Sequence, residues 1–429
     1  MRFLRQMPET IDLNDIQKLQ FSDKPRAELA IHQMLERSEG QPVDRVELNP
    51  KPESLNSVNG FVTFKNGNRY FFKAHTEENE QISEYYNAAL LAENGYPIIA
   101  AKQISHSPGQ QLVLYEILSL PTLFDLVKEA EDSQPAPPFP SDIEALLTAQ
   151  IELDRTTFAV YAKTLQEKSA SDHAQAPVNQ LFHHRLKQDG RLGLYYAGKK
   201  LALGTDEISF EQLSQLRWNI NGVVYDRTLS GIIAQSQDLL EPRSGPAVIG
   251  HGDAHNGNIF VDRTTGKFHM FDPAFAGVHS PILDLTKPTF HNVFARWMYY
   301  PHEVANEFEI SYKIDGNQIV IEHNYIPSQL RLRFLESRRQ NVIEPTVKLL
   351  KQHGMLPSSW GEYLRAAFFC CPFLTVNLFA TPVANGTLSE RYPLKIKLLG
   401  LCMAVELGSA PLSGSNRLSD IIADLLTEK

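Results

Sequence analysis

The first part of the chain alternates apolar and polar positions in a way that predicts short strands. Residues 43–48, 60–64 and 69–73 each show this alternation. The last two runs are joined by Lys65-Asn66-Gly67-Asn68. An Asn-Gly pair between apolar runs is a strong hairpin signal, because both residues accept the backbone conformation of a tight turn. This part of the chain therefore predicts an antiparallel sheet.

Apolar positions at helical spacing surround that sheet. They predict helices at 10–19 and 25–37 before it and at 77–93 after it, where Asn94-Gly95 is a typical helix end. Residues 97–103 and 110–118 predict two more strands, and 310–322 a hairpin. The later segments with a helical pattern are 141–168, 329–353, 359–379, 394–406 and 417–427. The whole pattern predicts an α+β fold, with a small antiparallel sheet part and a large, mostly helical part.

Breaks in the pattern suggest how the chain is divided. A helical extension is expected at 1–40, a strand-rich lobe at 41–118 and a helical lobe at 119–429. The proline-rich stretch 129–141 is typical of a loop. It opens an insertion of about residues 129–245, which we expect to be helical and to cover the site that selects the substrate.

Composition narrows the class of protein. The formal net charge of −9 argues against broad nucleic-acid binding, which favours basic surfaces. Three cysteines, two of them adjacent, do not make a disulfide framework and favour a cytoplasmic protein. No apolar run follows the first residues as in a signal peptide. The most apolar stretch, 366–380, is interrupted by Cys370-Cys371-Pro372 and predicts a buried helix rather than a membrane span.

Two neighbouring segments carry the chemistry. The first is His251-Gly252-Asp253-Ala254-His255-Asn256-Gly257-Asn258, and the second begins Phe271-Asp272-Pro273. Asp253 can accept a proton from an attacking hydroxyl, while Asn258 and Asp272 offer the hard oxygen ligands that Mg²⁺ prefers. Apolar runs at 259–261 and 268–271 flank a turn and predict a hairpin that holds both segments together. Phosphoryl transfer needs a positioned carboxylate and a metal clamp of this kind.

His-Gly-Asp, the following Asn258, a hairpin and then Asp272 resemble the catalytic core of the aminoglycoside phosphotransferase and choline kinase family, small-molecule relatives of the protein kinases. Asp284 is similar to the acid of the family's Asp-Leu position, which anchors the fold. The resemblance implies a protein-kinase-like fold of two lobes, with ATP between them. It implies Asp253 as the catalytic residue and Asn258 and Asp272 as Mg²⁺ ligands.

The same resemblance implies which residues hold the nucleotide. Lys73, at the end of the third predicted strand, would contact the α- and β-phosphates. Its partner would be a helix glutamate, and of Glu80 and Glu84 we choose Glu84 for its distance before Gly95.

A phosphate-covering loop precedes the second strand. It has no glycine-rich pattern, so a small hydroxyl such as Ser57 would replace glycine as a phosphate donor. The Glu116 carbonyl and the Leu118 N–H would face adenine, although Ser119-Leu120-Pro121 lacks the glycine that the family often has there.

The predicted reaction is transfer of the γ-phosphate of MgATP to a hydroxyl of a small molecule. Asp253 and Asn258 are also common turn residues, and His251, Asp253 and His255 are an alternative Zn²⁺ set of metallophosphoesterase type. A nucleotide-binding module without catalysis is a further alternative. A protein kinase is another, although the short segment between Asp272 and Asp284 has no Ala-Pro-Glu ending.

The expected acceptor is an amino sugar, an aminoglycoside, a sugar or an amino alcohol, and the sequence leaves the choice among them open. Asp272-Pro273-Ala274, with His279, resembles the fructosamine kinase branch, and Asp-Pro also resembles methylthioribose kinases. A choline-type acceptor would need an aromatic cage, for which the cluster Trp297, Tyr299 and Tyr300 is available. The basic residues of 183–200 form either a solvated helix face or a wall for an anionic group. No nucleic-acid or membrane partner is expected, and the oligomeric state is open.

Overall fold

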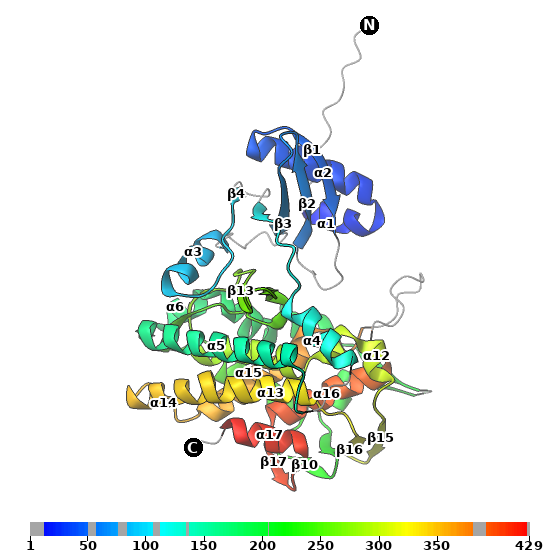
Figure 1. Ribbon diagram of the computed structural model, residues 1–429. Helices are drawn as coiled ribbons and strands as arrows, with labels where there is room; N and C mark the ends of the chain where they lie inside the picture. The colour runs from blue at the N-terminus through cyan, green and yellow to red at the C-terminus, as the bar shows by residue number, and fades with distance from the viewer. Residues whose placement is uncertain are drawn as a thin grey trace. The chain divides into compact units, whose positions relative to one another are not determined.

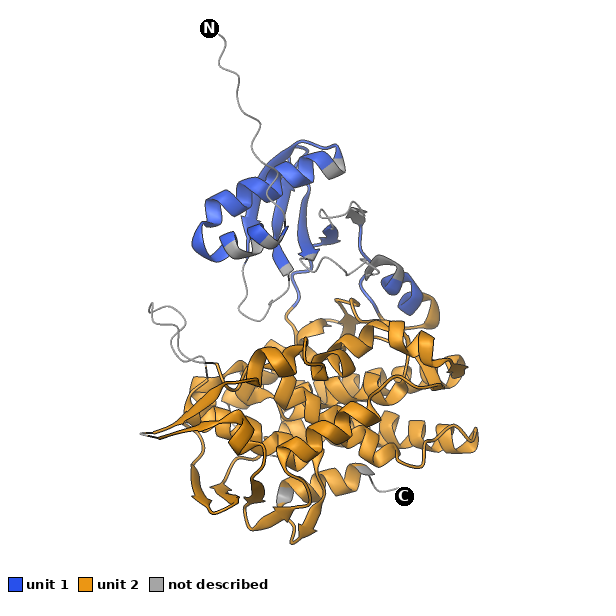
Figure 2. Ribbon diagram, turned by 180° about the vertical axis from the view of Figure 1, so that it is seen from behind, with its two compact units in different colours: residues 1–92, 98–120 blue, residues 93–97, 121–429 orange. Residues whose placement is uncertain are grey.

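The computed structural model describes residues 13–49, 57–75, 84–105, 112–133, 137–204, 206–380 and 392–426. The chain forms two compact units, shown in two colours in Figure 2. Unit 1 comprises residues 1–92 and 98–120, and unit 2 comprises residues 93–97 and 121–429. Unit 1 is built on an antiparallel sheet and unit 2 mainly on helices, so the predicted α+β class is confirmed.

Unit 1 contains a five-stranded antiparallel sheet in the order β1-β2-β3-β5-β4. The strands are β1 (Val43–Leu48), β2 (Ser57–Phe64), β3 (Arg69–His75), β4 (Gln103–Ser105) and β5 (Leu112–Glu116). The hairpin between β2 and β3 is confirmed, with Gly67 at a φ of 86° in the turn. The strand predicted at 97–103 is wrong except for its last residue. The Pro97 carbonyl instead accepts from the Met270 N–H, 2.7 Å away, inside unit 2.

Two helices complete the core of unit 1. Helix α1 (Leu13–Ser22) and helix α2 (Lys24–Glu39) lie along one face of the sheet, in blue in Figure 1. Ile16 and Ile31 are buried there against the sheet residue Val62. Burying this apolar face is what stabilises a helix of moderate length. Helix α3 (Glu84–Asn94) is described from Glu84 onward, so the predicted helix start at residue 77 lies outside the described residues.

Unit 2 is organised around long buried helices. The predicted helix at 329–353 is observed as α13 (Gln329–Arg338), a π-helical turn (Arg339–Ile343) and α14 (Glu344–Gln352). A proline lies at the start of α14 and has no N–H to donate to the preceding turn, which accounts for the wider turn there. Its other helices are α4 (Leu123–Asp132), α5 (Ser141–Thr164), α6 (Ala170–Gln175), α7 (Arg191–Tyr196), α8 (Phe210–Leu213), α9 (Leu229–Leu239), α10 (Pro281–Val293), α11 (Arg296–Tyr299), α12 (Pro301–Ala305), α15 (Trp360–Thr375), α16 (Leu394–Gly408) and α17 (Arg417–Leu426).

Several short strands of unit 2 were not predicted. Within the stretch expected to be helical, β7 (Lys200–Leu203), β8 (Asp206–Ser209), β9 (Arg217–Ile220) and β10 (Val223–Tyr225) are strands. Strands this short give too few alternating positions to be recognised in a sequence. The last two join β15 (Ile310–Asp315), β16 (Gln318–His323) and β17 (Pro411–Ser413) in one sheet, in which β15 and β16 form the predicted hairpin.

The remaining strands of unit 2 support the candidate site. Strand β11 (Gly245–Gly250) pairs with β6 (Gln166–Lys168) and β14 (Gly277–His279), and β12 (Ile259–Asp262) pairs with β13 (Lys267–Met270) as the predicted hairpin. Three short 3₁₀ helices complete the list: η1 (Pro177–Leu181), η2 (His183–Leu186) and η3 (Asn256–Asn258). Among the described residues, no helix has both the length and the apolar character needed to cross a membrane.

Candidate active site

The site is built on the loop between β11 and β12. Gly252 turns the chain with a φ of 78°, and a Cβ there would lie 2.2 Å from the Phe275 carbonyl oxygen. Only glycine fits this approach. The His255 N–H donates to the Asp253 carbonyl at 2.8 Å, and the Asn258 N–H donates to the His255 carbonyl at 2.8 Å. These bonds wind the loop into η3 and hold Asp253 in a fixed place.

Backbone bonds also connect this loop to the second segment. The Phe271 N–H donates to the Asn258 carbonyl at 2.8 Å, and the His251 Nε2 lies 2.9 Å from the Phe271 carbonyl oxygen. The next residue, Asp272, has a φ of 57°, which is uncommon for a residue other than glycine and often marks a functional position. The structure therefore brings together three residues that were predicted from the sequence: Asp253, Asn258 and Asp272.

The oxygen atoms at this place suit a hard divalent cation. Asn258 donates its Nδ2 to the Asp253 carbonyl at 2.9 Å, which leaves its Oδ1 as an acceptor for a ligand. Two protein oxygens are a typical complement for Mg²⁺, which keeps waters and substrate phosphates as its other ligands. Within the described part of the chain, no group of three His, Cys, Asp or Glu residues is arranged to hold a metal. His251 is also committed to backbone groups, so the Zn²⁺ alternative has no support.

Asp253 is buried and paired with a lysine that the sequence reading missed. Its Oδ2 accepts a hydrogen bond of 2.7 Å from the Nζ of Lys287 on α10, and its Oδ1 lies 3.7 Å from the His255 Nε2. Burial alone would raise the pKa of Asp253, but the Lys287 ammonium and His255 outweigh burial and hold the pKa at about 2. Asp253 is therefore ionised throughout the neutral range. A lone lysine within the apolar pattern of α10 was the signal available in the sequence.

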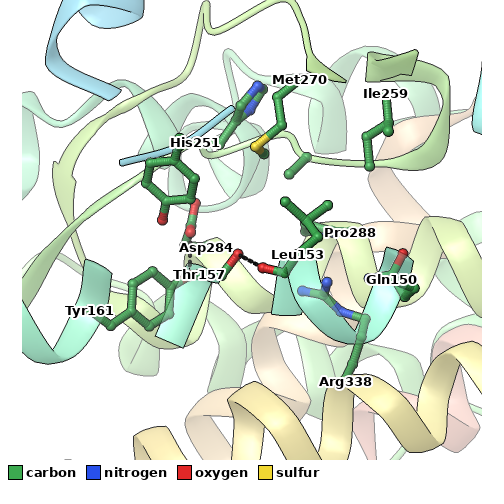
Figure 3. Close-up of a pocket in the computed structure, with 12 residues that line it drawn as sticks. Gln150, Leu153, Thr157, Tyr161, His251, Ile259, Met270, Asp284, Pro288 and Arg338 are labelled. Carbon is green, nitrogen blue, oxygen red and sulfur yellow. Dashed lines mark hydrogen bonds between the residues drawn. The ribbon is translucent and has the colours of Figure 1, made fainter. Parts of the chain in front are cut away.

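Asp284 supports the loop through the hydrogen bonds of its carboxylate. It accepts hydrogen bonds from the Tyr161 hydroxyl and the Gly252 N–H, and its Oδ1 lies 3.0 Å from the His279 Nε2. Figure 3 shows Asp284 directed toward Tyr161 beneath His251. A Cβ at Gly250 would lie 2.5 Å from this carboxylate. The position of Asp284 agrees with the anchoring role implied by the family resemblance.

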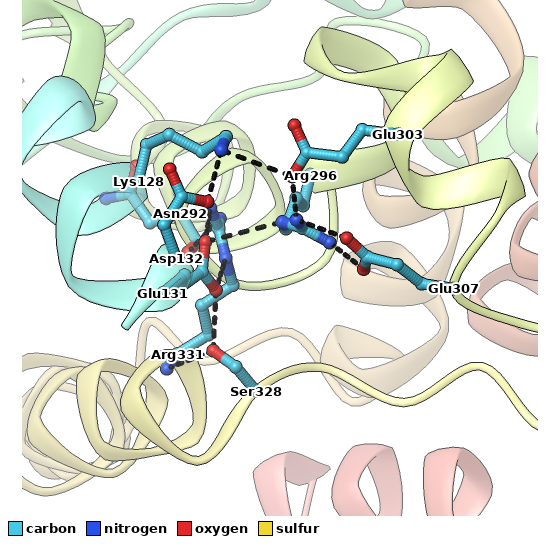
Figure 4. A network of polar contacts seen from close by, with 9 residues as sticks. All are labelled: Lys128, Glu131, Asp132, Asn292, Arg296, Glu303, Glu307, Ser328 and Arg331. Atoms are coloured by element: carbon cyan, nitrogen blue, oxygen red, sulfur yellow. Dashed lines mark hydrogen bonds and ion pairs between the residues drawn. The ribbon is translucent and has the colours of Figure 1, made fainter. Parts of the chain in front are cut away.

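A second network of polar contacts binds the backbone of η3 in this loop. The Asn256 N–H donates to the Asn292 Oδ1 at 2.7 Å, and the Arg331 guanidinium donates to the Asn292 carbonyl at 3.0 Å. Arg331 also forms a bidentate pair with Glu131, at 2.7 and 2.9 Å. Figure 4 shows Asn292 beside this pair, with Arg296 and its acidic partners alongside. The backbone of η3 is thus held by a buried ion-pair network.

The residues predicted to bind the nucleotide lie in unit 1. Lys73 is 7% exposed in β3, opposite Asn59 of β2 and Val113 of β5. Ser57 begins β2 and Glu84 begins α3, but their side chains lie outside the described residues. The Lys73–Glu84 pair and the Ser57 hydroxyl contact therefore stay predictions.

The other two nucleotide residues, Glu116 and Leu118, lie where the sheet ends. Glu116 is the last residue of β5, opposite Tyr70 of β3, and its exposed side chain pairs with Lys102 at 2.6 Å. Leu118 lies in the irregular segment that follows, and its N–H has no hydrogen-bond partner in the part of the chain that the structure describes. This N–H is available to a ligand, as the adenine prediction requires.

The aromatic cluster does not form a cage. Trp297 is fully buried and donates its Nε1 to the Met403 sulfur. The Tyr299 and Tyr300 rings both pack on Phe124, with centroids 4.7 and 5.5 Å away. These contacts belong to the protein's own packing, and the choline-type acceptor stays a prediction.

With this geometry in view, comparison with known proteins finds one family model that matches part of the chain. Residues 170–309 match the model of the phosphotransferase enzyme family. The match includes the loop of Asp253 and the segment of Asp272, and it confirms the resemblance stated from the sequence. It supports a small-molecule phosphotransferase. The search of curated proteins found no match.

Among solved structures, similar chains include a Plasmodium vivax ethanolamine kinase, with 11% identity, a TM-score of 0.47 and 95% of each chain covered. A spectinomycin phosphotransferase in complex with ADP and spectinomycin has 13% identity and a TM-score of 0.46, covering 89% of this chain and 97% of its own. A putative fructosamine-3-kinase from Thermobifida fusca has 11% identity and a TM-score of 0.37, covering 87% and 98%. At these values the likenesses carry no argument about activity, which depends on the family match and the site.

Proposed function

We propose that this protein is a small-molecule kinase that transfers the γ-phosphate of MgATP to a hydroxyl group. The observation that carries the proposal is the Asp253 carboxylate. It is buried, ionised, fixed on one oxygen by Lys287, and without a hydrogen-bond partner on the other oxygen among the described residues. A buried carboxylate oxygen without a donor is costly unless a ligand supplies one. An acceptor hydroxyl is such a donor.

In the proposed reaction, the acceptor hydroxyl donates to the Asp253 Oδ1. The hydroxyl oxygen attacks the γ-phosphorus, the bond from that phosphorus to the ADP oxygen breaks, and the hydroxyl proton passes to Asp253 and then to solvent. A pKa of about 2 makes Asp253 a weak base. Its main contribution is therefore to orient the hydroxyl, which suits a loose transition state in which the proton leaves late.

Asn258 and Asp272 are the residues that we propose to hold Mg²⁺, through the Asn258 Oδ1 and the Asp272 carboxylate. A bound Mg²⁺ would neutralise charge on the phosphate oxygens. In unit 1, Lys73 with Glu84 would contact the phosphates, Ser57 would donate to them, and the backbone of Glu116 and Leu118 would bind adenine. A cytoplasmic location fits ATP as the donor.

The test is ADP release from MgATP with wild type and Asp253→Ala side by side, over a panel of aminoglycosides, amino sugars, thio-sugars and amino alcohols. We expect one class to stimulate ADP release in the wild type. Asp253→Ala should lower turnover by at least about 100-fold, because a positioned base or orienting group contributes this much, while nucleotide binding is kept. Asp315→Ala, at an exposed hairpin residue, serves as the matched control.

Turnover of Asp253→Ala within about tenfold of the wild type would contradict the assignment. Nucleotide binding without turnover on any acceptor would favour the non-catalytic module instead.

A further inference from the structure

Unit 2 contains a cavity of about 390 Å³ that is separate from the candidate active site. It is lined by the segment around the end of β16 and by residues of α16 and α17. Residues 251–258 and 271–272 are all described, and none of them lines it. In Figure 1, β10, β16 and α17 lie at the bottom of unit 2, away from β13 of the site hairpin. The volume is in the range of pockets that bind small molecules, about 300–1,000 Å³.

Glu406 of α16 is a buried acid that lines this cavity. It is 1% exposed. Its Oε1 accepts hydrogen bonds from the Asn416 Nδ2 at 3.1 Å and from the Tyr225 hydroxyl at 3.5 Å. Its Oε2 has no hydrogen-bond partner among the described residues. A buried oxygen without a partner costs free energy, so this carboxyl group needs a ligand or a water molecule to complete it.

His323 adds unpartnered nitrogen atoms beside this acid. It also lines the cavity, its side chain is 4% exposed, and its Nε2 lies 4.0 Å from the Glu406 Oε2. Neither ring nitrogen has a hydrogen-bond partner in the part of the chain that the structure describes. The separation is too long for a direct hydrogen bond, but a single donor atom about 2.9 Å from each group can bond to both.

The surrounding structure holds these two residues in position. The His323 N–H donates to the Asn221 Oδ1 at 2.7 Å, and β16 pairs with β15 up to this residue. The Asn416 Oδ1 accepts from the Ser419 N–H at 2.8 Å, which directs the Asn416 Nδ2 toward Glu406. One oxygen of Glu406 is therefore fixed by the protein, and the other is left for a ligand.

The charges around the cavity favour a cation. Glu406 and the exposed Glu322 line it, and the described lining residues include no lysine or arginine. The titratable groups near Glu406 are His323 of β16, Tyr225 of β10 and Cys402 of α16 itself. None of them is a cation at neutral pH, because burial lowers the pKa of His323 to about 4 and raises the pKa of the Tyr225 hydroxyl and of the Cys402 thiol. His323 is therefore a neutral acceptor and not a counter-ion.

The other walls favour an organic cation over a metal ion. Apolar side chains also line the cavity, namely those of Ile326, Pro327, Met403, Leu418 and Ile421. Such walls bind the hydrocarbon part of a ligand by removing it from water. A metal ion would need more ligands, and no group of three His, Cys, Asp or Glu residues in the described structure is arranged to hold one.

We propose that this cavity binds a small primary amine, with its ammonium nitrogen between Glu406 and His323 and its apolar part against α16 and α17. One N–H donates to the Glu406 Oε2 and another donates to the His323 Nε2. A primary ammonium group carries three donors, so it can make both bonds. The inference goes beyond the proposed kinase reaction and does not depend on it.

Binding of the amine is coupled to a proton. Burial raises the pKa of Glu406 to about 8, so the acid is protonated at pH 7 in the free protein. Pairing with an ammonium group favours the carboxylate, and the proton of Glu406 passes to solvent. Each amine bound at pH 7 should therefore release about one proton, and the affinity should rise by about tenfold from pH 6 to pH 7.

The experiment is calorimetric titration of the full chain with butylamine and with benzylamine, at pH 6 and pH 7 and in two buffers of different ionisation enthalpy. The wild type should bind at least one of these amines with the proton release given above. Benzyl alcohol has a similar shape without the charge, and benzyltrimethylammonium has the charge without an N–H donor. Each should bind at least about tenfold more weakly than benzylamine.

Three variants locate the amine. Glu406→Gln should weaken amine binding by about 10- to 100-fold and abolish proton release, because it removes one charge-assisted hydrogen bond. Glu322→Gln, at the exposed acid of the same cavity, should change the affinity by less than about threefold, because solvent and salt screen an exposed charge. Ile421→Trp fills the cavity from α17 and should block amine binding, while the pH dependence of its stability remains that of the wild type.

Three outcomes overturn the inference. If neither amine binds to the wild type, a water molecule is the better partner for Glu406 and His323. If benzyl alcohol binds as tightly as benzylamine, the cavity is an apolar pocket without a cation site. If Glu406→Gln or Ile421→Trp binds the amine as the wild type does, the amine lies elsewhere. ADP release is not measured in this test, so its result is independent of the kinase proposal.

Discussion

Two groups of buried charge in unit 2 are built from the same residue types but are balanced differently. In the first, Glu131 pairs with Arg331 through two bonds, and Ser328 donates to the same carboxylate at 2.6 Å (Figure 4). In the second, Asp253 is bonded by Lys287 on one oxygen, and its other oxygen has no hydrogen-bond partner among the described residues.

The difference distinguishes charged groups that support the structure from charged groups that take part in function. A buried ion pair that is fully hydrogen-bonded can hold a backbone in place, as the Glu131 network does for η3 through Asn292. A buried charge left without a partner costs stability, and a chain retains such a group where a ligand completes it. The comparison therefore distinguishes two kinds of buried charge in unit 2. The Glu131 network stabilises the loop, and the Asp253 carboxylate has an oxygen left to bind a ligand.

The largest effect is expected from breaking the balanced network. Glu131→Ala leaves Arg331 and Arg296 without their shared carboxylate, and removing one partner of a buried pair costs about 3–5 kcal/mol. Urea unfolding measures this loss. Glu129→Ala, at a neighbouring exposed residue of α4, is the control. A loss below about 1 kcal/mol would mean that the network does not stabilise unit 2.

A smaller effect is expected in the unbalanced cluster. Lys287→Met removes the only hydrogen bond that the described residues make to the Asp253 carboxylate and should lower the free energy of unfolding by about 1–3 kcal/mol. Adding Asp253→Asn removes the orphaned charge and should recover most of that loss, while ADP release remains abolished. Recovery of stability without recovery of turnover would mark this pair as functional. If the double variant is no more stable than Lys287→Met, the cluster resembles the structural network and the comparison fails.

The third effect is a change in the pH dependence of stability, and it concerns Glu406, which belongs to neither group. Burial raises the pKa of Glu406 from its ordinary 4.5 to about 8, and its Oε2 lacks a hydrogen-bond partner in the described structure, with the His323 Nε2 at 4.0 Å. Between these two pH values the folded protein holds a proton that the unfolded chain releases. The contribution of Glu406 to stability is therefore fully present below pH 4.5 and is lost as the pH rises toward 8, by up to about 1.4 kcal/mol per pH unit.

Glu406→Gln cannot titrate and should flatten this dependence, as measured by urea unfolding at intervals from pH 5 to pH 8. Glu322→Gln, at an exposed residue that lines the same cavity of about 390 Å³, should leave the slope unchanged. Parallel curves for wild type and Glu406→Gln would show that burial does not hold the proton.

The parts of the fold that follow local rules were readable from the sequence. The β2–β3 hairpin and the β12–β13 hairpin each depend on a short turn between apolar runs, and both are confirmed. The segment 97–103 was misread because only its end joins the sheet: the Pro97 carbonyl accepts from the Met270 N–H, whereas the Lys102 N–H donates to the Leu114 carbonyl of β5. Strands β7 to β10 are too short to show their period.

The candidate site was predictable where the residues are close in sequence. Asp253, Asn258 and Asp272 lie in two segments joined by one hairpin, so their proximity follows from local structure. Lys287 reaches the same place from α10, and no local pattern reports such long-range packing. The charge balance of the site depends on residues that are distant in the sequence, so it cannot be predicted from a local pattern.

The close approach of Gly250 and Gly252 to Asp284 and Phe275 has a consequence for how this enzyme can diversify. At both positions the space for even a single methyl group is taken. Random substitution will therefore be rejected there whatever the acceptor is. New specificities are expected from residue exchanges outside this loop.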